Sequence, residues 1–130
     1  IAVRRPGVIP RPALPAELRR AHIHVVPSRW DEPFGLTTVE GMASGLAIVA
    51  SRTGGTAEIV ADAGLLFERD DVDGLAAHLT RLLDARELCA DYGRLARARA
   101  EKFSWDATWS RLSALLGVRS PRREPQSALP

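Results

Sequence analysis

The stretch HIHVVPSRWDEPFGLTTVEGMASGLAIVAS, residues 22–51, predicts the fold of this chain. It begins and ends with apolar, β-branched runs, residues 22–26 and 46–51, whose length is typical of buried strands. Between them, apolar residues recur at the spacing of one helix face: Val39, Met42, Ala43 and Leu46. Two strands joined by a helix form a parallel βαβ unit, so the stretch predicts an α/β fold.

The flanking segments extend this alternation in both directions. Residues 1–9 predict a short strand, and residues 15–21 predict a short helix with Pro15 in its first turn. Further on, residues 56–63 predict a helix and residues 64–67 a strand. The expected architecture is a Rossmann-like parallel sheet with flanking helices.

The C-terminal part of the chain predicts three helices with apolar stripes. The stripes contain Leu75, Leu79 and Leu82 in the first helix, Leu88, Tyr92 and Leu95 in the second, and Trp105, Trp109, Leu112 and Leu116 in the third. We expect Trp105 and Trp109 to pack against the rest of the protein. Residues 1–117 therefore predict one domain, and residues 118–130 predict a disordered tail.

Charge and cysteine content argue against several classes of protein. The 130 residues include 18 basic and 16 acidic ones, for a net charge of +2, but many arginines lie near the two ends. Because the middle of the chain is more acidic than basic, we expect no nucleic-acid partner. A lone cysteine, Cys89, fits a buried core position in a cytoplasmic protein. His22 and His24 lack a third ligand, so we expect no metal site and no bound cofactor.

Two glycine-containing loops follow the strands of the βαβ unit, at residues 27–37 and 52–56. In an open parallel sheet, ligands bind beyond the carboxyl ends of the strands, where these loops lie. Gly35 stands just before the helix, so the amides of Leu36 and Thr37 can approach a ligand, and a helix N-terminus favours an anion. The pattern therefore predicts a phosphate or pyrophosphate site.

Two carboxylates, Glu32 and Glu40, flank this anion site. Since carboxylates accept hydrogen bonds from paired hydroxyl groups, a sugar or ribose diol fits beside each of them. Together with the phosphate site, they indicate a nucleoside diphosphate sugar. Two alternatives stay open: the pair could be the acid and nucleophile of a glycosidase, or two solvated surface charges. The helix start that suits a phosphate argues against the glycosidase.

The segment PSRWDEPFGLTTVEGMASG followed by AIVASRTGGTAEIV resembles the C-terminal domain of retaining glycosyltransferases of family 4, which have the GT-B fold. The family's motif of two glutamates separated by seven residues corresponds to Glu32 and Glu40. The resemblance implies that Glu32 binds the transferred sugar and Glu40 the ribose, and we expect both to be catalytic. It also implies a donor-binding site, made here of Ser28, Phe34, Gly35, Leu36, Thr37, Gly54 and Gly55.

The same resemblance implies an enzyme that transfers a hexose with retention of configuration and needs no metal. The acceptor would be a glycan or a lipid-linked glycan in polysaccharide assembly. For the full-length enzyme, the expected location is the cytoplasm, including the periphery of the inner membrane. Neither the nucleotide, the sugar nor the acceptor is specified by the sequence.

The sequence does not contain all the segments that the family pattern has. The family's domain opens with two further βα units that bring an Arg and a Lys to the diphosphate, and a separate N-terminal domain binds the acceptor. We therefore expect the chain alone to be inactive. A non-catalytic nucleotide-sugar-binding remnant, dimerising through an exposed sheet edge, is the alternative. Gly41 stands where the family often has Ala, a difference expected to matter little.

Overall fold

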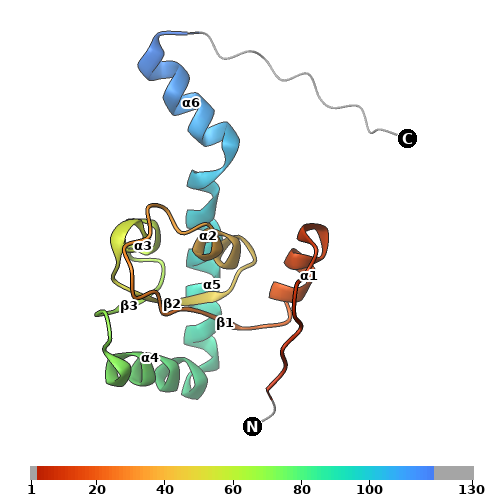
Figure 1. Cartoon of the computed structure of the whole chain (residues 1–130), viewed down its shortest axis with the longest axis vertical. Coiled ribbons are helices and arrows are strands. Elements are labelled where there is room, and N and C mark those ends of the chain that lie inside the picture. Colours follow the sequence, from red (N-terminus) through yellow and green to blue (C-terminus); the bar gives the residue numbers. More distant parts are fainter. Residues whose placement is uncertain (1–2, 119–130) are drawn as a thin grey trace.

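A computed structural model describes residues 3–118 and contains three parallel strands flanked by helices (Figure 1). The strands are β1 (Ile23–Val26), β2 (Ala47–Ser51) and β3 (Leu65–Phe67), and they lie in the order β1-β2-β3. Val26 pairs with Ala50, and Ser51 pairs with Phe67. The α/β fold class expected from the sequence is confirmed.

One helix precedes the first strand, a helix follows each strand, and two more complete the described chain. The first is α1 (Leu14–Leu18), which a 3-10 turn, η1 (Arg11–Ala13), precedes. The others are α2 (Leu36–Ala43), α3 (Gly54–Val60), α4 (Val72–Asp84), α5 (Arg86–Ala100) and α6 (Trp105–Leu116), with a second 3-10 turn, η2 (Glu101–Phe103), between the last two. In Figure 1, α2 lies between α3 and α1.

The core lies on both faces of β2, whose five residues are all buried. Ile48 and Ala50 face one apolar cluster, which includes Met42 of α2 and Ile59 of α3. Ala47 and Val49 face a second cluster, which includes Leu82 of α4 and Cys89 of α5. Burial of both faces explains why β2 is apolar without alternation, as expected for a central parallel strand.

The N-terminal strand predicted for residues 1–9 is absent from the described part of that segment, residues 3–9. Two prolines, Pro6 and Pro10, remove backbone donors that a strand needs, and no strand of the described chain pairs there. Helix α3 begins at Gly54, two residues earlier than the sequence pattern predicted.

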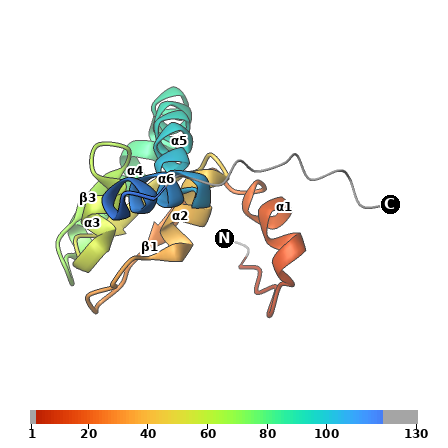
Figure 2. The same cartoon turned by 90° about the horizontal axis from the view of Figure 1, so that it is seen from above.

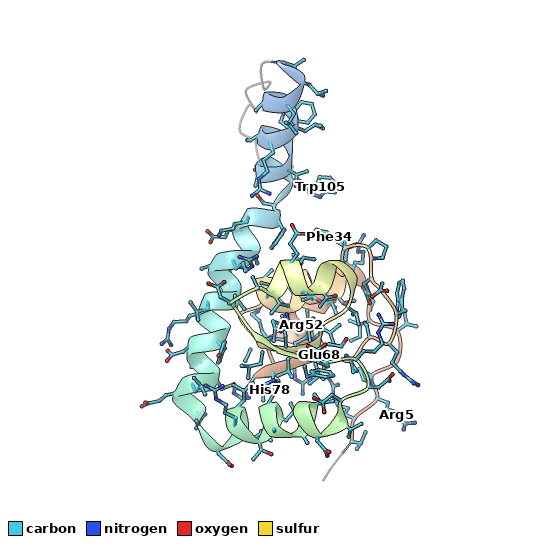
Figure 3. All side chains as sticks on the ribbon, turned by 90° about the vertical axis from the view of Figure 1, so that its left-hand side faces the viewer. Arg5, Phe34, Arg52, Glu68, His78 and Trp105 are labelled. Atoms are coloured by element: carbon cyan, nitrogen blue, oxygen red, sulfur yellow. The ribbon has the colours of Figure 1, made fainter. Side chains whose placement is uncertain are left out.

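Helix α6 stands apart from the body of the protein (Figure 1), and in the view from above it lies in front of the body (Figure 2). It begins at Ser104, whose hydroxyl accepts a hydrogen bond from the amide of Ala107 at 3.2 Å. Trp105 is 83% exposed and Trp109 is 41% exposed, so the prediction that both pack against the domain is wrong (Figure 3). Helical spacing identified the apolar face of α6 but not what covers it. Of the tail predicted for residues 118–130, only Val118 belongs to the described residues, and residues 119–130 lie outside them.

Candidate functional site

The loops after β1 and β2 touch at the carboxyl end of the sheet. The amide of Gly55 donates to the carbonyl oxygen of Glu32 at 2.8 Å. A Cβ on Gly54 would lie 2.4 Å from that same oxygen, and a Cβ on Gly55 would lie 2.6 Å from the carbonyl oxygen of Pro33. Only residues without a side chain allow this approach, and Gly54 also has φ +45°. The two glycines therefore bring the loop that carries Glu32 against the start of α3.

Gly35 starts α2 in a left-handed conformation, with φ 83° and ψ 60°. No side chain caps this helix start. The next two residues, Leu36 and Thr37, are exposed, so the amides of the first turn face an open surface. An uncapped, exposed helix N-terminus carries a partial positive charge and free donors, which suits an anionic group.

A chain of hydroxyl groups holds the Glu32 side chain. The hydroxyl of Ser28 donates to Oε1 of Glu32 at 2.9 Å. The hydroxyl of Ser51, at the end of β2, donates in turn to the carbonyl oxygen of Ser28 at 2.7 Å. Glu32 is partly exposed, so its carboxylate is fixed by its neighbours while one side faces solvent.

Ion pairs tie the Glu32 loop to the segment after β3. Arg69 pairs with Asp31 at 2.5 Å, and Oδ1 of Asp31 also accepts from the amide of Gly54 at 3.2 Å. Arg29 pairs with Asp70 at 2.6 Å. The partners are 38 and 41 residues apart in sequence, so no local pattern could have revealed these contacts. A further exposed pair, Arg52 with Glu68, lies nearby (Figure 3).

Glu40 lies in different surroundings, on the side of α2 that faces α1. It lines a cavity of about 280 Å³. The other lining residues come from the segment around α1, the end of α2 and α5: Arg11, Leu14, Pro15, Leu18, Arg19, Ala43, Ser44 and Arg97. Glu32, by contrast, belongs to the α3 side of α2. The two carboxylates thus lie on different sides of α2, Glu32 beside its start and Glu40 farther along it, instead of sharing one cluster.

His24 of β1 lies under α2 beside Glu40. Burial lowers the pKa of His24, while the Glu40 carboxylate and the nearby backbone of Thr37 act in the opposite direction. A Cβ on Gly41 would lie 2.7 Å from the His24 ring. The expectation that Gly41 in place of Ala matters little is therefore wrong, because an alanine here would force the His24 ring to move.

Phe34 packs away from the Glu32 cluster. Its ring contacts Phe103 of η2 edge-on, with the ring centroids 5.9 Å apart and the planes at 77° (Figure 3). Five of the expected site residues do come together around the loop contact: Ser28, Glu32, Gly35, Gly54 and Gly55. Leu36 and Thr37 adjoin them on the surface, whereas Phe34 and Glu40 face other neighbours.

A larger cavity, of about 840 Å³, lies elsewhere and includes none of the expected site residues. Its walls come from β1, the end of α4 and α5, and they include Ile23, Leu82, Cys89 and Gly93. Within residues 3–118, no cluster of His, Cys, Asp and Glu side chains suits a metal ion. None of the helices described there has the length and apolar character needed to cross a membrane.

A family model described as glycosyl transferases group 1 matches residues 2–99. The chain belongs to this family. A relative from Catenulispora acidiphila, D-inositol 3-phosphate glycosyltransferase 2, is 44% identical over 92 residues, which cover 69% of this chain and 21% of the relative. The expectation of a glycosyltransferase, drawn from the paired glutamates and the glycine loops, is thereby confirmed at the level of this family.

Solved structures confirm the fold of this glycosyltransferase segment. Sucrose-phosphate synthase from Thermosynechococcus elongatus is 32% identical, with a TM-score of 0.77 over 85% of this chain and 28% of the synthase. The HepE protein of Anabaena, solved in complex with UDP-glucose, is 24% identical with a TM-score of 0.72, over 80% of this chain and 29% of HepE. The chain spans only a fifth to a third of the length of the relatives it matches.

Proposed function

We propose that this chain is the donor-binding part of a glycosyltransferase and binds a nucleoside diphosphate sugar. In this proposal, residues 1–117 form part of the C-terminal domain, and a longer polypeptide supplies the acceptor site. The main support for this proposal is the contact between the two glycine-containing loops, because Glu32 lies there beside the uncapped start of α2. The HepE structures in complex with UDP and UDP-glucose support the choice of donor.

The diphosphate would bind at the first turn of α2. Leaving-group departure builds negative charge on the diphosphate, and the amides of Leu36 and Thr37 can stabilise that charge without reorganising. Gly54 and Gly55 would form the adjoining wall. An amide donor of this kind is worth about 3 kcal/mol, or roughly a hundredfold in rate.

Glu32 would accept hydrogen bonds from the hydroxyls of the transferred sugar. Ser28 fixes one oxygen of its carboxylate, and the partial exposure of the side chain leaves it accessible to a ligand. Glu40 would bind the ribose, because among the described residues it is the one carboxylate that lines the cavity of about 280 Å³ beside α1 and α2. The transfer itself would retain the anomeric configuration and use no metal.

Calorimetric titration of the purified chain tests these roles. UDP-glucose, UDP, GDP-mannose and GDP are titrated separately, so that uridine and guanosine donors are both covered. Glu32→Gln is expected to weaken sugar-nucleotide binding about tenfold and to leave the free nucleotide unaffected, because only the sugar contacts are lost. Glu40→Ala is expected to weaken both.

Glu87→Gln is the matched control, since Glu87 is an exposed carboxylate at the start of α5. It should leave every affinity unchanged. Failure of the wild-type chain to bind either sugar nucleotide would overturn the proposal, as would unchanged binding by Glu40→Ala. The isolated chain is expected to show no turnover of the bound donor.

A further inference from the structure

Two buried threonine hydroxyls near Glu32 have no hydrogen-bond partner among the described residues. Thr38 and Thr56 are both 0% exposed. Neither Oγ1 atom forms a hydrogen bond in the described part of the chain. Because an unpaired buried hydroxyl is costly, native proteins retain few of them, and those that persist call for an explanation.

The positions of these threonines explain why their hydroxyls are unpaired. Thr38 is the third residue of α2, and Thr56 is the third residue of α3. Inside a helix, a threonine hydroxyl often bonds to the carbonyl four residues earlier, but at the third position that residue precedes the helix. Neither hydroxyl makes such a bond here. Both therefore remain available to a group lying between the two helix starts.

The carboxylate of Glu32 lies in this region. A Cβ on Gly35 would lie 3.3 Å from Oγ1 of Thr56, 3.4 Å from Oγ1 of Thr38 and 3.5 Å from Oε2 of Glu32. Three side-chain oxygens thus surround the place where Gly35 has no side chain. Two of them can donate, and the ionised carboxylate only accepts.

The two oxygens of this carboxylate have different neighbours. Oε1 accepts from Ser28, which Ser51 holds through its backbone carbonyl. Oε2 is the oxygen that shares the space beside Gly35 with the hydroxyls of Thr38 and Thr56. The terminal torsion of a glutamate is broad, so a small rotation moves Oε2 toward the hydroxyls at little cost.

We propose that Thr38 and Thr56 are positioning residues that donate hydrogen bonds to Oε2 of Glu32. With Ser28 on Oε1, they would hold the carboxylate in one orientation and leave a lone pair of Oε1 to accept a hydroxyl of the transferred sugar. The inference rests on the proposed donor-binding function for its consequence, whereas the proposed hydrogen bonds would form in the ligand-free chain as well.

Proton NMR of the ligand-free chain tests the hydrogen bonds without any donor. Buried hydroxyl protons exchange slowly with water, and donation to a carboxylate moves their resonances downfield. Glu32→Gln is expected to shift the hydroxyl resonances of Thr38 and Thr56 upfield. The hydroxyl of Ser113, which is buried and donates to the carbonyl oxygen of Ser110, is the internal control and should not move. Unchanged Thr38 and Thr56 resonances would overturn the proposal.

Donor selectivity tests the functional consequence. Thr38→Val and Thr56→Val keep the side-chain shape and remove the donor; each is expected to lower the affinity ratio of UDP-glucose to UDP, or of GDP-mannose to GDP, about fivefold. Thr56→Ser should restore the ratio, which a purely structural role would not predict. Thr80→Val, on the exposed side of α4, is the matched control.

The outcomes separate the two proposals. If the wild-type chain binds neither sugar nucleotide, the donor-binding function fails, and the NMR result still decides whether the threonines donate to Glu32. If the chain binds a donor and both valine variants keep the wild-type ratio, the positioning role is wrong although the donor site stands.

Discussion

Gly55→Ala is expected to separate the two loops that form the candidate site. Gly55 lies in α3 with an ordinary helical backbone, so alanine itself fits and favours the helix by about 1 kcal/mol. Its Cβ, however, would lie 2.6 Å from the carbonyl oxygen of Pro33. Ordinary contact begins near 3.4 Å, so the loop would have to move by roughly 0.8 Å.

The energetic consequence follows from three contributions. Overpacking against a rigid backbone costs about 1–3 kcal/mol. Weakening of the 2.8 Å bond from the Gly55 amide to the Glu32 carbonyl adds about 1 kcal/mol. After subtraction of the helix gain, the free energy of unfolding should fall by about 1–3 kcal/mol. Because the shift moves the Glu32 backbone, affinity for the sugar nucleotide should also fall, about tenfold.

Urea denaturation followed by circular dichroism, together with donor titration, measures both effects. Gly45→Ala is the control, since Gly45 has φ +79° and nothing lies within 4 Å of its added Cβ. That variant should lose about 1–2 kcal/mol from backbone strain alone and keep its donor affinity. A Gly55→Ala protein as stable as the wild type, with unchanged donor affinity, would refute the loop contact.

Three further predictions concern other parts of the fold. Burial lowers the pKa of His24, so below about pH 6.5 the unfolded chain binds a proton that the folded chain does not. The free energy of unfolding should therefore fall as the pH drops below that value. In urea titrations at several pH values, His24→Leu should reduce this dependence on pH. Arg99 donates to the carbonyl oxygens of Glu58 and Ile59 at the end of α3. Arg99→Ala should therefore lower the free energy of unfolding by about 1–3 kcal/mol, measured by thermal or chemical denaturation. The control Arg94→Ala removes an exposed side chain and should leave that free energy almost unchanged. Cys89 is buried, and burial raises the pKa of its thiol. A thiol reagent should therefore react with Cys89 slowly until urea unfolds the chain. Fast reaction in the folded chain would contradict this burial.

The βαβ unit was predictable because buried strands and helix faces require apolar residues at regular spacings in the sequence. Both faces of β2 are covered, which requires an uninterrupted apolar run, and α2 turns Met42 toward the core at helical spacing. The glycines at 54 and 55 were equally informative, since each lies against backbone atoms of the neighbouring loop. Elements that pack together and lie within about 30 residues of each other in the chain could therefore be predicted from the sequence.

Features set by distant partners were not predictable. The pairing of Asp31 with Arg69 depends on two loops that meet only after the sheet has formed. The edge-on contact of Phe34 with Phe103 likewise joins elements far apart in the chain. Trp105 follows helical spacing, yet its exposure depends on the direction in which α6 leaves the body. Periodicity identifies an apolar face but not its neighbour.

The most direct test of the central claim is an amide NMR titration of the chain with UDP-glucose and, in parallel, with GDP-mannose. The account predicts that the largest shifts occur at the amides of Gly35, Leu36, Thr37 and Gly54, where the two loops meet the start of α2. Shifts concentrated instead around Cys89 and Gly93, in the larger cavity, or no shifts with either donor, would contradict it.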